Sequence, residues 1–324
     1  MTERLSLIVS DSTDPRHNLA LEAVLLETAK ENTVILYLWQ NDNTVVIGRN
    51  QNIWKECNLK NIERDGVTIV RRPSGGGAVY HDLGNLNFSF IAEDALFDIE
   101  RQTRMIMKAL AALGIETEMS GRNDILTQGK KISGNAYQHH RGFSCQHGTL
   151  LVNSDLSRMG MYLNADPAKL KAKGVDSVRS RVTSLKEICG RADIGILKEE
   201  IIKSCEETLK TEAKTDLTID PEALRKEEER FSSDAWTYGK NPPFDLFLEN
   251  RFAWGGIRLE FRIKAGRIAD LTVWTDAMDT EIAGRLKETL CGCVFSPSFM
   301  YEALQKCGKE EYRDIAAWIL NQEV

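Results

Sequence analysis

The feature that most constrains this chain is a glycine-rich segment between two predicted strands. Residues 71–77 read Arg-Arg-Pro-Ser-Gly-Gly-Gly, with apolar strand patterns at 67–70 and 86–91. Three successive glycines permit positive φ angles, so that several backbone N–H groups can face one anion. The two arginines add planar donors suited to carboxylate or phosphate oxygens. The segment therefore predicts an anion-binding loop carried by a sheet.

A glycine-rich hairpin turn with solvated arginines is the alternative interpretation of this segment. A hairpin needs only two turn residues, whereas Tyr80 and His81 also lie between the two strands, which favours the anion site. No G-x-G-x-x-G follows a strand and no G-x-x-x-x-G-K-[ST] occurs, so neither common nucleotide fingerprint is present. A bound nucleotide would need another scaffold.

Composition narrows the class of protein. The 324 residues are 42% hydrophobic and 28% charged, with a net charge of −6, which gives no general reason to bind nucleic acid or an anionic membrane. We expect no signal peptide at the N-terminus and find no apolar run long enough to span a bilayer. Seven scattered cysteines indicate reduced thiols. These features together predict a cytoplasmic protein.

The length favours one large and one small domain. The segment 236–243, with Gly239 and two prolines, is the best boundary, so we expect domains at 1–240 and 241–324. In the second, apolar residues at 257, 259, 261 and 263 alternate with charged ones, which predicts a half-buried strand. A second strand at 268–274 and two or three amphipathic helices complete a small α+β module.

Within the large domain, local signals predict several elements. Asp14-Pro15 is expected to start a helix, and Asp98 and Gly114 to bound another. Gln128-Gly129 is expected to form a hairpin tip, after which Lys131 and Ser133 would face away from a buried Ile132. Strands are predicted at 5–9, 34–39, 44–47 and 149–153, and helices at 194–209 and 221–231.

Three features have both a functional and a plain interpretation. Glu22 lies amid apolar residues of the first helix, either as a solvated carboxylate or as a buried pocket group. The basic run 169–181 is either a loop that closes over an anion or a solvated linker. Cys145 lies close to His147, as a nucleophile would. A zinc site involving His139 and His140 is disfavoured, because adjacent histidines cannot easily point at one ion.

Four motifs together closely resemble those of the lipoate protein ligases. They read Arg72-Pro-Ser-Gly-Gly-Gly-Ala-Val-Tyr-His-Asp-Leu-Gly-Asn85, Gly121-Arg-Asn-Asp124, Lys131-Ile-Ser-Gly-Asn-Ala-Tyr137 and His147-Gly-Thr-Leu150. The resemblance covers nearly the whole chain. It implies an α+β fold, with the mixed sheet and packed helices of the biotin and lipoate protein ligases plus a small C-terminal accessory domain.

The resemblance also implies a reaction. Lipoate and ATP, with Mg²⁺, would give lipoyl-adenylate and pyrophosphate, and the lipoyl group would then pass to a lysine. The implied acceptors are lipoyl domains of 2-oxoacid dehydrogenase E2 subunits and the glycine cleavage H protein, and the implied state is a monomer. Adenylation is needed because a carboxylate is a poor electrophile without a leaving group.

By the same resemblance, residues take roles. Lys131 would be catalytic and Asp124 the magnesium ligand. The lipoate-binding residues would be Glu22, Trp39, Arg72, Ser74, His81 and His147. The nucleotide-binding residues would be Arg72, Gly75, Gly76, Gly77, Ala78, Val79, Tyr80, Asn85, Asn123, Lys131, Ala136 and Thr149. A loop closing over the adenylate would include Lys173, Gly174, Val175, Asp176, Ser177 and Val178. Gln138 stands where some relatives have an arginine.

Rival functions stay open on the sequence. A lipoyl or octanoyl transferase that uses an acyl thioester would need a cysteine nucleophile, and only Cys145 is close to the motifs. A transferase that accepts preformed lipoyl-adenylate, or a lipoate-binding carrier without chemistry, would share the same motifs. Biotin ligation is disfavoured by the Arg-Pro-Ser-Gly-Gly-Gly loop.

Overall fold

The computed structural model describes residues 3–121, 123–164, 182–238, 245–264 and 266–322. The chain divides into two compact units. The first comprises Met1–Ile47, Trp54–Arg72 and Ala78–Tyr238, and the second comprises Gly48–Ile53, Pro73–Gly77 and Gly239–Val324. None of the described helices is long and apolar enough to cross a membrane.

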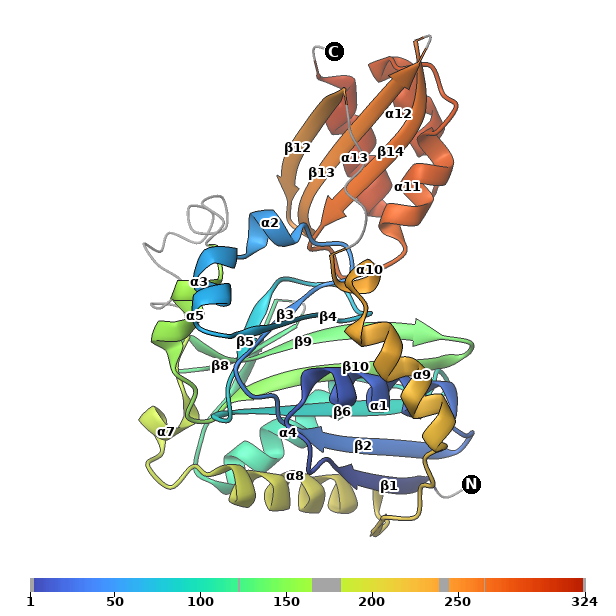
Figure 1. The fold of residues 1–324 in the computed structure, drawn as a ribbon. Helices are drawn as coiled ribbons and strands as arrows, with labels where there is room; N and C mark the ends of the chain where they lie inside the picture. The colour runs from blue at the N-terminus through green and yellow to red at the C-terminus, as the bar shows by residue number, and fades with distance from the viewer. Residues whose placement is uncertain (1–2, 122, 165–181, 239–244, 265, 323–324) are drawn as a thin grey trace. The chain divides into compact units, whose positions relative to one another are not determined.

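Helices and strands alternate irregularly along the described chain (Figure 1). The strands are β1 (Arg4–Val9), β2 (Thr33–Trp39), β3 (Thr44–Ile47), β4 (Thr68–Arg71), β5 (Val79–His81), β6 (Asn85–Glu93), β7 (Glu118–Ser120), β8 (Asp124–Thr127), β9 (Lys130–His140), β10 (Phe143–Leu151), β11 (Ala213–Lys214), β12 (Leu246–Phe252), β13 (Gly255–Lys264) and β14 (Arg267–Thr275). The helices are α1 (Pro15–Glu27), α2 (Ile53–Glu56), α3 (Leu59–Arg64), α4 (Ile99–Ala112), α5 (Leu156–Tyr162), α7 (Leu185–Ile188), α8 (Ile194–Leu209), α9 (Pro221–Ser232), α10 (Asp234–Thr237), α11 (Ile282–Leu290), α12 (Pro297–Gln305) and α13 (Glu310–Leu320).

A mixed sheet of eight strands organises the first unit, in the order β11-β1-β2-β6-β10-β9-β8-β7. β1 runs parallel to both β11 and β2, and the remaining neighbours are antiparallel. Both faces are covered by helices (Figure 1). This arrangement confirms the expected mixed sheet with packed helices.

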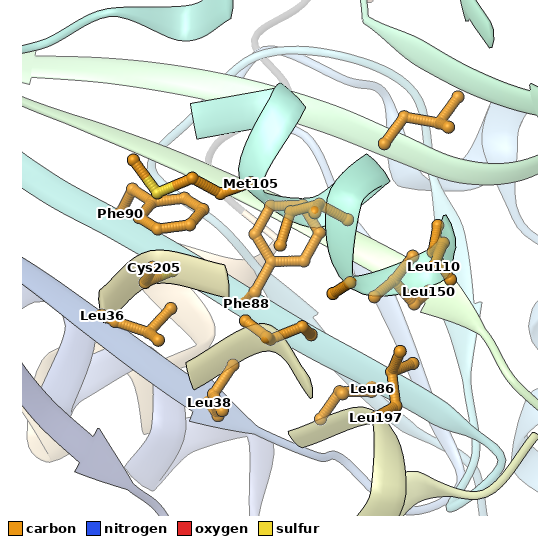
Figure 2. Packing of buried hydrophobic residues seen from close by; sticks show 14 of the residues in the cluster. Leu36, Leu38, Leu86, Phe88, Phe90, Met105, Leu110, Leu150, Leu197 and Cys205 are labelled. Carbon is orange, nitrogen blue, oxygen red and sulfur yellow. The ribbon is translucent and has the colours of Figure 1, made fainter. Parts of the chain in front are cut away.

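Side chains on β2 show how the two faces are filled. Val34, Leu36 and Leu38 pack with α4 and α8 on one face, whereas Ile35 and Tyr37 pack with α1 on the other. The alternation follows from the two-residue period of a strand. Figure 2 shows the first of these clusters, with Leu36, Leu38, Leu86, Phe88, Phe90, Met105, Leu110, Leu150, Leu197 and Cys205 labelled. We call the opposite face, covered by α1, the α1 face.

Local sequence signals are confirmed at the ends of several elements. Asp14 caps α1 through Arg16 N–H, and Asp98 caps α4 through Arg101 N–H. Gly114 follows α4 with φ of 78°, a conformation in which glycine lacks the steric cost of a side chain. Gln128 and Gly129 have φ of 50° and 72° and form the predicted β8–β9 hairpin tip.

A second, smaller sheet in the order β4-β3-β5 includes one strand that the sequence did not predict. β5 has three residues and pairs antiparallel with β3, so that His81 lies opposite Thr44. A three-residue strand leaves too short an apolar pattern to be recognised. The segment between Arg72 and Asn85 is therefore partly sheet, and His81 is held by backbone pairing.

The second unit has its own core. β12, β13 and β14 form an antiparallel sheet against which α11, α12 and α13 pack. Ile257, Leu259 and Phe261 are buried in this core, as their alternation predicted. The unit also includes two short loops, Gly48–Ile53 and Pro73–Gly77, that the sequence division placed in the large domain.

Candidate functional site

Glu22 is the centre of a buried polar cluster on the α1 face. Its side chain is fully buried, and its carboxylate accepts hydrogen bonds from Ser89 Oγ at 2.5 Å and from His147 Nδ1 at 2.9 Å. Trp39 Nε1 in turn donates to Ser89 Oγ at 3.0 Å. The interpretation of Glu22 as a solvated carboxylate is therefore wrong. The sequence analysis did not identify Ser89, whose hydroxyl joins the carboxylate to Trp39.

Strand register explains why these groups meet. Ser89 of β6 lies directly opposite His147 of β10 and Tyr37 of β2. Residues that pair across strands point to the same face, and α1 places Glu22 above that face. Gln138 of β9 reaches Glu22 Oε2 from the next strand, with its Nε2 at 3.5 Å. Helix α1 and the four strands β2, β6, β9 and β10 thus contribute to one cluster.

The electrostatics of Glu22 show that it is a carboxylate. Burial alone would raise its pKa, but the charge and hydrogen bond of His147, together with the hydroxyl of Ser89, outweigh burial and lower it. Because the carboxylate only accepts hydrogen bonds, Nδ1 of His147 carries the proton. The site therefore presents a fixed, oriented imidazole.

Arg72, the residue after β4, and His81, the last residue of β5, are two buried groups beside the small sheet. Burial lowers the pKa of Arg72 to about 10, and its Nη1 donates to Val46 O at 3.2 Å. Nδ1 of His81 lies 3.2 Å from Asn41 Nδ2, while its buried Nε2 has no hydrogen-bond partner among the residues that the structure describes. A ligand with a polar atom could satisfy that nitrogen.

His81 should make the first unit sensitive to acid. Burial, with the charges of Arg72 and His147, lowers its pKa to about 3, against about 6.5 in an unfolded chain. Between these values the unfolded state binds more protons, so stability falls as the pH drops below 6.5. From pH 7.5 to 5.5 the loss from this group is about 1.4 kcal/mol.

Denaturant unfolding at the two pH values tests this. We expect His81→Gln to lose about 1.4 kcal/mol less than the wild type over that interval, whereas His139→Gln, at an exposed histidine, should behave as the wild type does. An equal loss in the wild type and in His81→Gln would contradict the assignment.

Lys131 and Asp124 form an ion pair at the β8–β9 hairpin. Lys131 Nζ lies 2.7 Å from Asp124 Oδ1, with side-chain exposures of 33% and 17%. Gly134, opposite Asp124, leaves room for the ammonium group, because a Cβ there would lie 2.7 Å from Nζ. The sequence expectation that Lys131 and Ser133 share a face is wrong. A bulge shifts the register, and Ser133 pairs instead with Ile125, a residue of the opposite core.

The turn that precedes Asp124 is held by a second polar network. Asn123 Nδ2 donates to Asn135 O at 2.8 Å, and Asn135 Nδ2 donates back to Asn123 O at 3.0 Å. Gln146 Nε2 donates to Asn135 Oδ1 and to Thr103 Oγ1, which ties the network to α4. Asn135 and Gln146 are thus positioning residues that the motif comparison did not single out.

The remaining expected site residues in the first unit are placed as follows. Asn85 Nδ2 donates to Asn87 Oδ1, and within the described part of the chain the buried atoms Asn85 Oδ1 and Asn87 Nδ2 have no hydrogen-bond partner. Thr149 Oγ1 accepts from Gly134 N–H at 3.3 Å. The Tyr80 ring is buried against Tyr162. Ala78 directly precedes β5, and Val79 is its first residue. Ala136 lies opposite His147 in the pairing of β9 with β10.

Arg71 joins two elements of the first unit. Its Nε donates to the carbonyl oxygens of Trp236 and Thr237 at 3.2 and 3.0 Å, and Trp236 Nε1 donates to Arg71 O at 2.8 Å. These bonds fasten α10 to β4, and anion binding by Arg71 stays a prediction.

The glycine loop, within the second unit, is in contact with the β14–α11 connection. Gly76 N–H donates to Ala277 O at 3.2 Å, and Ser74 O accepts from Arg49 N–H. A Cβ on Gly75 would overlap Ala277 O and lie 2.8 Å from Met278 O. Glycine at 75 is thus required by a close backbone approach. That Ser74, Gly75, Gly76 and Gly77 hold lipoate or phosphate oxygens stays a prediction.

The expected adenylate loop, including Lys173, Gly174, Val175, Asp176, Ser177 and Val178, lies outside the described residues. Its C-terminal neighbour is described. Val182 forms a parallel bridge with Lys131, and Thr183 N–H donates to Lys131 O at 3.0 Å. Val182 and Thr183 are therefore anchored to the backbone of Lys131.

Cys145 is poorly suited to nucleophilic catalysis. It is fully buried, and burial, with the charge of Glu22, raises the pKa of its thiol well above the usual value. A neutral thiol is a weak nucleophile.

The two adjacent histidines each lie beside a carboxylate: His139 pairs with Asp94, and His140 pairs with Glu27.

Comparison with protein families gives two matches that follow one another along the chain. The sequence model described as "Lipoyl protein ligase A/B catalytic domain" matches residues 14–210. The chain belongs to this family. A second model, "Bacterial lipoate protein ligase C-terminus", matches residues 241–319. The resemblance seen in the sequence motifs is confirmed.

Solved structures of lipoate protein ligases share the fold. LipL1 from P. falciparum, in complex with lipoate, is 29% identical with a TM-score of 0.87, over 98% of this chain and 100% of that chain. Lipoate-protein ligase A bound with ATP is 26% identical with a TM-score of 0.65, over 74% and 99%. The bipartite ligase of Thermoplasma acidophilum, studied with its E2 lipoyl domain, is 26% identical with a TM-score of 0.65, over 76% and 100%.

Proposed function

We propose that the protein is an ATP-dependent lipoate protein ligase. Lipoate and ATP would form lipoyl-adenylate and pyrophosphate, and a lysine amine of an acceptor domain would then displace AMP. The observation that carries the proposal is the Lys131–Asp124 pair, which shares the α1 face with the buried Glu22 cluster.

The distance between these two groups suits an acyl chain. Gly134 lies beside Lys131, and Gln138, four residues further along β9, reaches Glu22. Four strand residues span about 13 Å, and Gly134, Ala136 and Gln138 point to the same face. Ala136, a small residue opposite His147, lies between the two ends. We infer that the acyl chain lies along β9, with its carboxylate towards Lys131.

Lys131 would act where negative charge builds during displacement at the α-phosphorus. A fixed ammonium group there stabilises the transition state more than the separated substrates. Its anchor is twofold, because Asp124 binds Nζ and Thr183 binds the backbone carbonyl. Arg72 and the unpartnered Nε2 of His81 are the further donors that we assign to the acyl substrate.

Asp124 fits the demands of magnesium. Its side chain is partly exposed and offers carboxylate oxygens beside Lys131, and Mg²⁺ commonly uses one or two carboxylates together with substrate phosphates and water. When bound, the ion would neutralise charge on the phosphates. Asn123 would contact the adenosine, held in place by Asn135.

The acceptor is proposed by likeness alone. The Thermoplasma ligase was studied with an E2 lipoyl domain, and we propose lipoyl domains of E2 subunits and the H protein as acceptors here. A thioester transferase is disfavoured, because the thiol of Cys145 is buried and protonated. A transferase that uses only preformed lipoyl-adenylate is the second candidate, since the fold alone does not separate the two reactions.

The test combines the full chain, a purified lipoyl domain, ATP, Mg²⁺ and lipoate, with mass spectrometry of the acceptor. We expect a lipoyl mass increase that requires ATP and accompanies AMP release. Cys145→Ser should retain it. Transfer from supplied lipoyl-adenylate without activation of free lipoate would support the second candidate, and loss of transfer in Cys145→Ser would support a thioester mechanism.

A further inference from the structure

Glu22, Cys145 and His147 bring three metal-binding side chains together inside the α1 face. One ligand atom from each lies within 4.8 Å of the other two, and all three residues are buried. They come from α1 and β10, which lie against each other in the first unit (Figure 1). Thiolate, imidazole and carboxylate form a ligand set that suits zinc.

We propose that these three side chains bind Zn²⁺ and that the bound ion excludes lipoate from the acyl pocket. The cation site stands on the geometry alone, whereas the competition rests on the proposed function. Zinc would replace the thiol proton of Cys145, which is released to solvent. The Nδ1 proton of His147 would also be lost while Nε2 takes up one proton from solvent, so two metal bonds replace the hydrogen bond between His147 and Glu22. With the imidazole neutral, as a metal ligand requires, the net charge of the three side chains together with the bound ion would change from −1 to 0.

The ligand pair formed by His147 and Glu22 is close to the spacing that zinc requires. Tetrahedral zinc with Zn–N and Zn–O of about 2.0 Å and Zn–S of about 2.3 Å places its ligand atoms roughly 3.3–3.6 Å apart. His147 Nδ1 and Glu22 Oε2 are 2.9 Å apart, so they must separate by a few tenths of an ångström. Ser89 donates to Glu22 and is itself held by Trp39, and such outer partners orient metal ligands.

The neighbouring residues Arg72 and Gln138 affect how tightly the site would bind zinc. Three protein ligands leave a fourth position open, whereas structural zinc sites usually have four protein ligands. The Arg72 guanidinium interacts with the charge of Glu22 and would oppose a cation, so the affinity should be moderate. Gln138 next to Glu22 is neutral, and replacing it by arginine would add a second opposing charge.

Cobalt(II) in place of zinc tests the site without ATP or lipoate. We expect the full chain to bind one Co²⁺ with thiolate-to-cobalt charge-transfer absorption, which zinc then displaces. Cys145→Ala should lose that absorption and weaken zinc binding by more than the roughly 10- to 100-fold that loss of an outer partner costs. Cys205→Ala, at a buried thiol of the opposite core, is the matched control and should keep both. Gln138→Arg should weaken binding while all three ligands remain.

Oxidised lipoate tests the competition. We expect it to raise the apparent Kd of zinc, and zinc to inhibit ligation by the wild type but not by Cys145→Ala. No charge-transfer absorption in the wild type, or equal zinc affinity in Cys145→Ala, would overturn the site whether or not the protein is a ligase. Absorption that saturating lipoate leaves unchanged would overturn the competition, while normal ligation in the same preparation would leave the proposed function intact.

Discussion

Lys131→Ala is expected to reduce lipoate-dependent pyrophosphate exchange at least about 100-fold. Loss of a fixed donor to developing charge costs about 3 kcal/mol or more. The fold should survive, because Lys131 is one-third exposed and its ion pair lies at a hairpin end, where such pairs contribute about 1 kcal/mol or less. The isotope-exchange assay between pyrophosphate and ATP reports the adenylation step alone.

Lys130→Ala is the matched control for this substitution. Lys130 is the adjacent residue of the same strand, is exposed, and pairs with Thr127 through the backbone. It should retain exchange within about twofold, because no ligand contact is assigned to it and surface substitutions usually change little. Normal exchange in Lys131→Ala would remove the central residue of the proposed mechanism.

Gly148→Ala is expected to destabilise the first unit by about 3 kcal/mol, because forced overpacking typically costs about 1–3 kcal/mol. A Cβ at this position would overlap the Phe88 ring and Asn135 Oδ1, and both belong to strands paired with β10. A loss of this size lowers the Tm of a unit of this length by roughly 6–12 °C. Thermal unfolding followed by near-UV circular dichroism measures it.

The same substitution should also weaken nucleotide binding. Asn135 accepts from Gln146 and holds Asn123, so displacing its amide disturbs the turn before Asp124. Gly160→Ala is the control, since no atom lies within 4 Å of a Cβ there and the residue lies in α5. It should leave the Tm equal or slightly higher, as alanine favours helix. A Gly148→Ala protein as stable as Gly160→Ala would contradict the packing.

Local rules in the sequence correctly predicted elements whose causes are local. Asp14 with Pro15, Asp98 with Gly114, and Gln128-Gly129 each specify a cap or turn from neighbouring residues. The bulge before Ser133 was missed, because it depends on the register between β8 and β9 and not on either strand alone.

In the candidate site too, some residues could be identified from the sequence, and others only from the fold. Motifs identified Glu22, His147 and Lys131, but the hydroxyl of Ser89 that joins Glu22 to Trp39 lies in an ordinary strand pattern. The grouping of Cys145 with Glu22 was also missed, because more than a hundred residues separate them. Only the register of four strands and the position of α1 bring these side chains together.

The contact of Gly75 with Ala277 and Met278 changes how an inactive relative could be recognised. A relative without catalytic activity would still need glycine at position 75, because any side chain there would overlap the backbone of Ala277. An intact Gly-Gly-Gly sequence is therefore weak evidence of catalytic activity. The Lys131 side chain is one-third exposed and belongs to none of the hydrophobic clusters of the described residues, so packing in that part of the chain would not preserve it once its substrate was gone. The ammonium group at 131 is accordingly the better diagnostic of a working ligase.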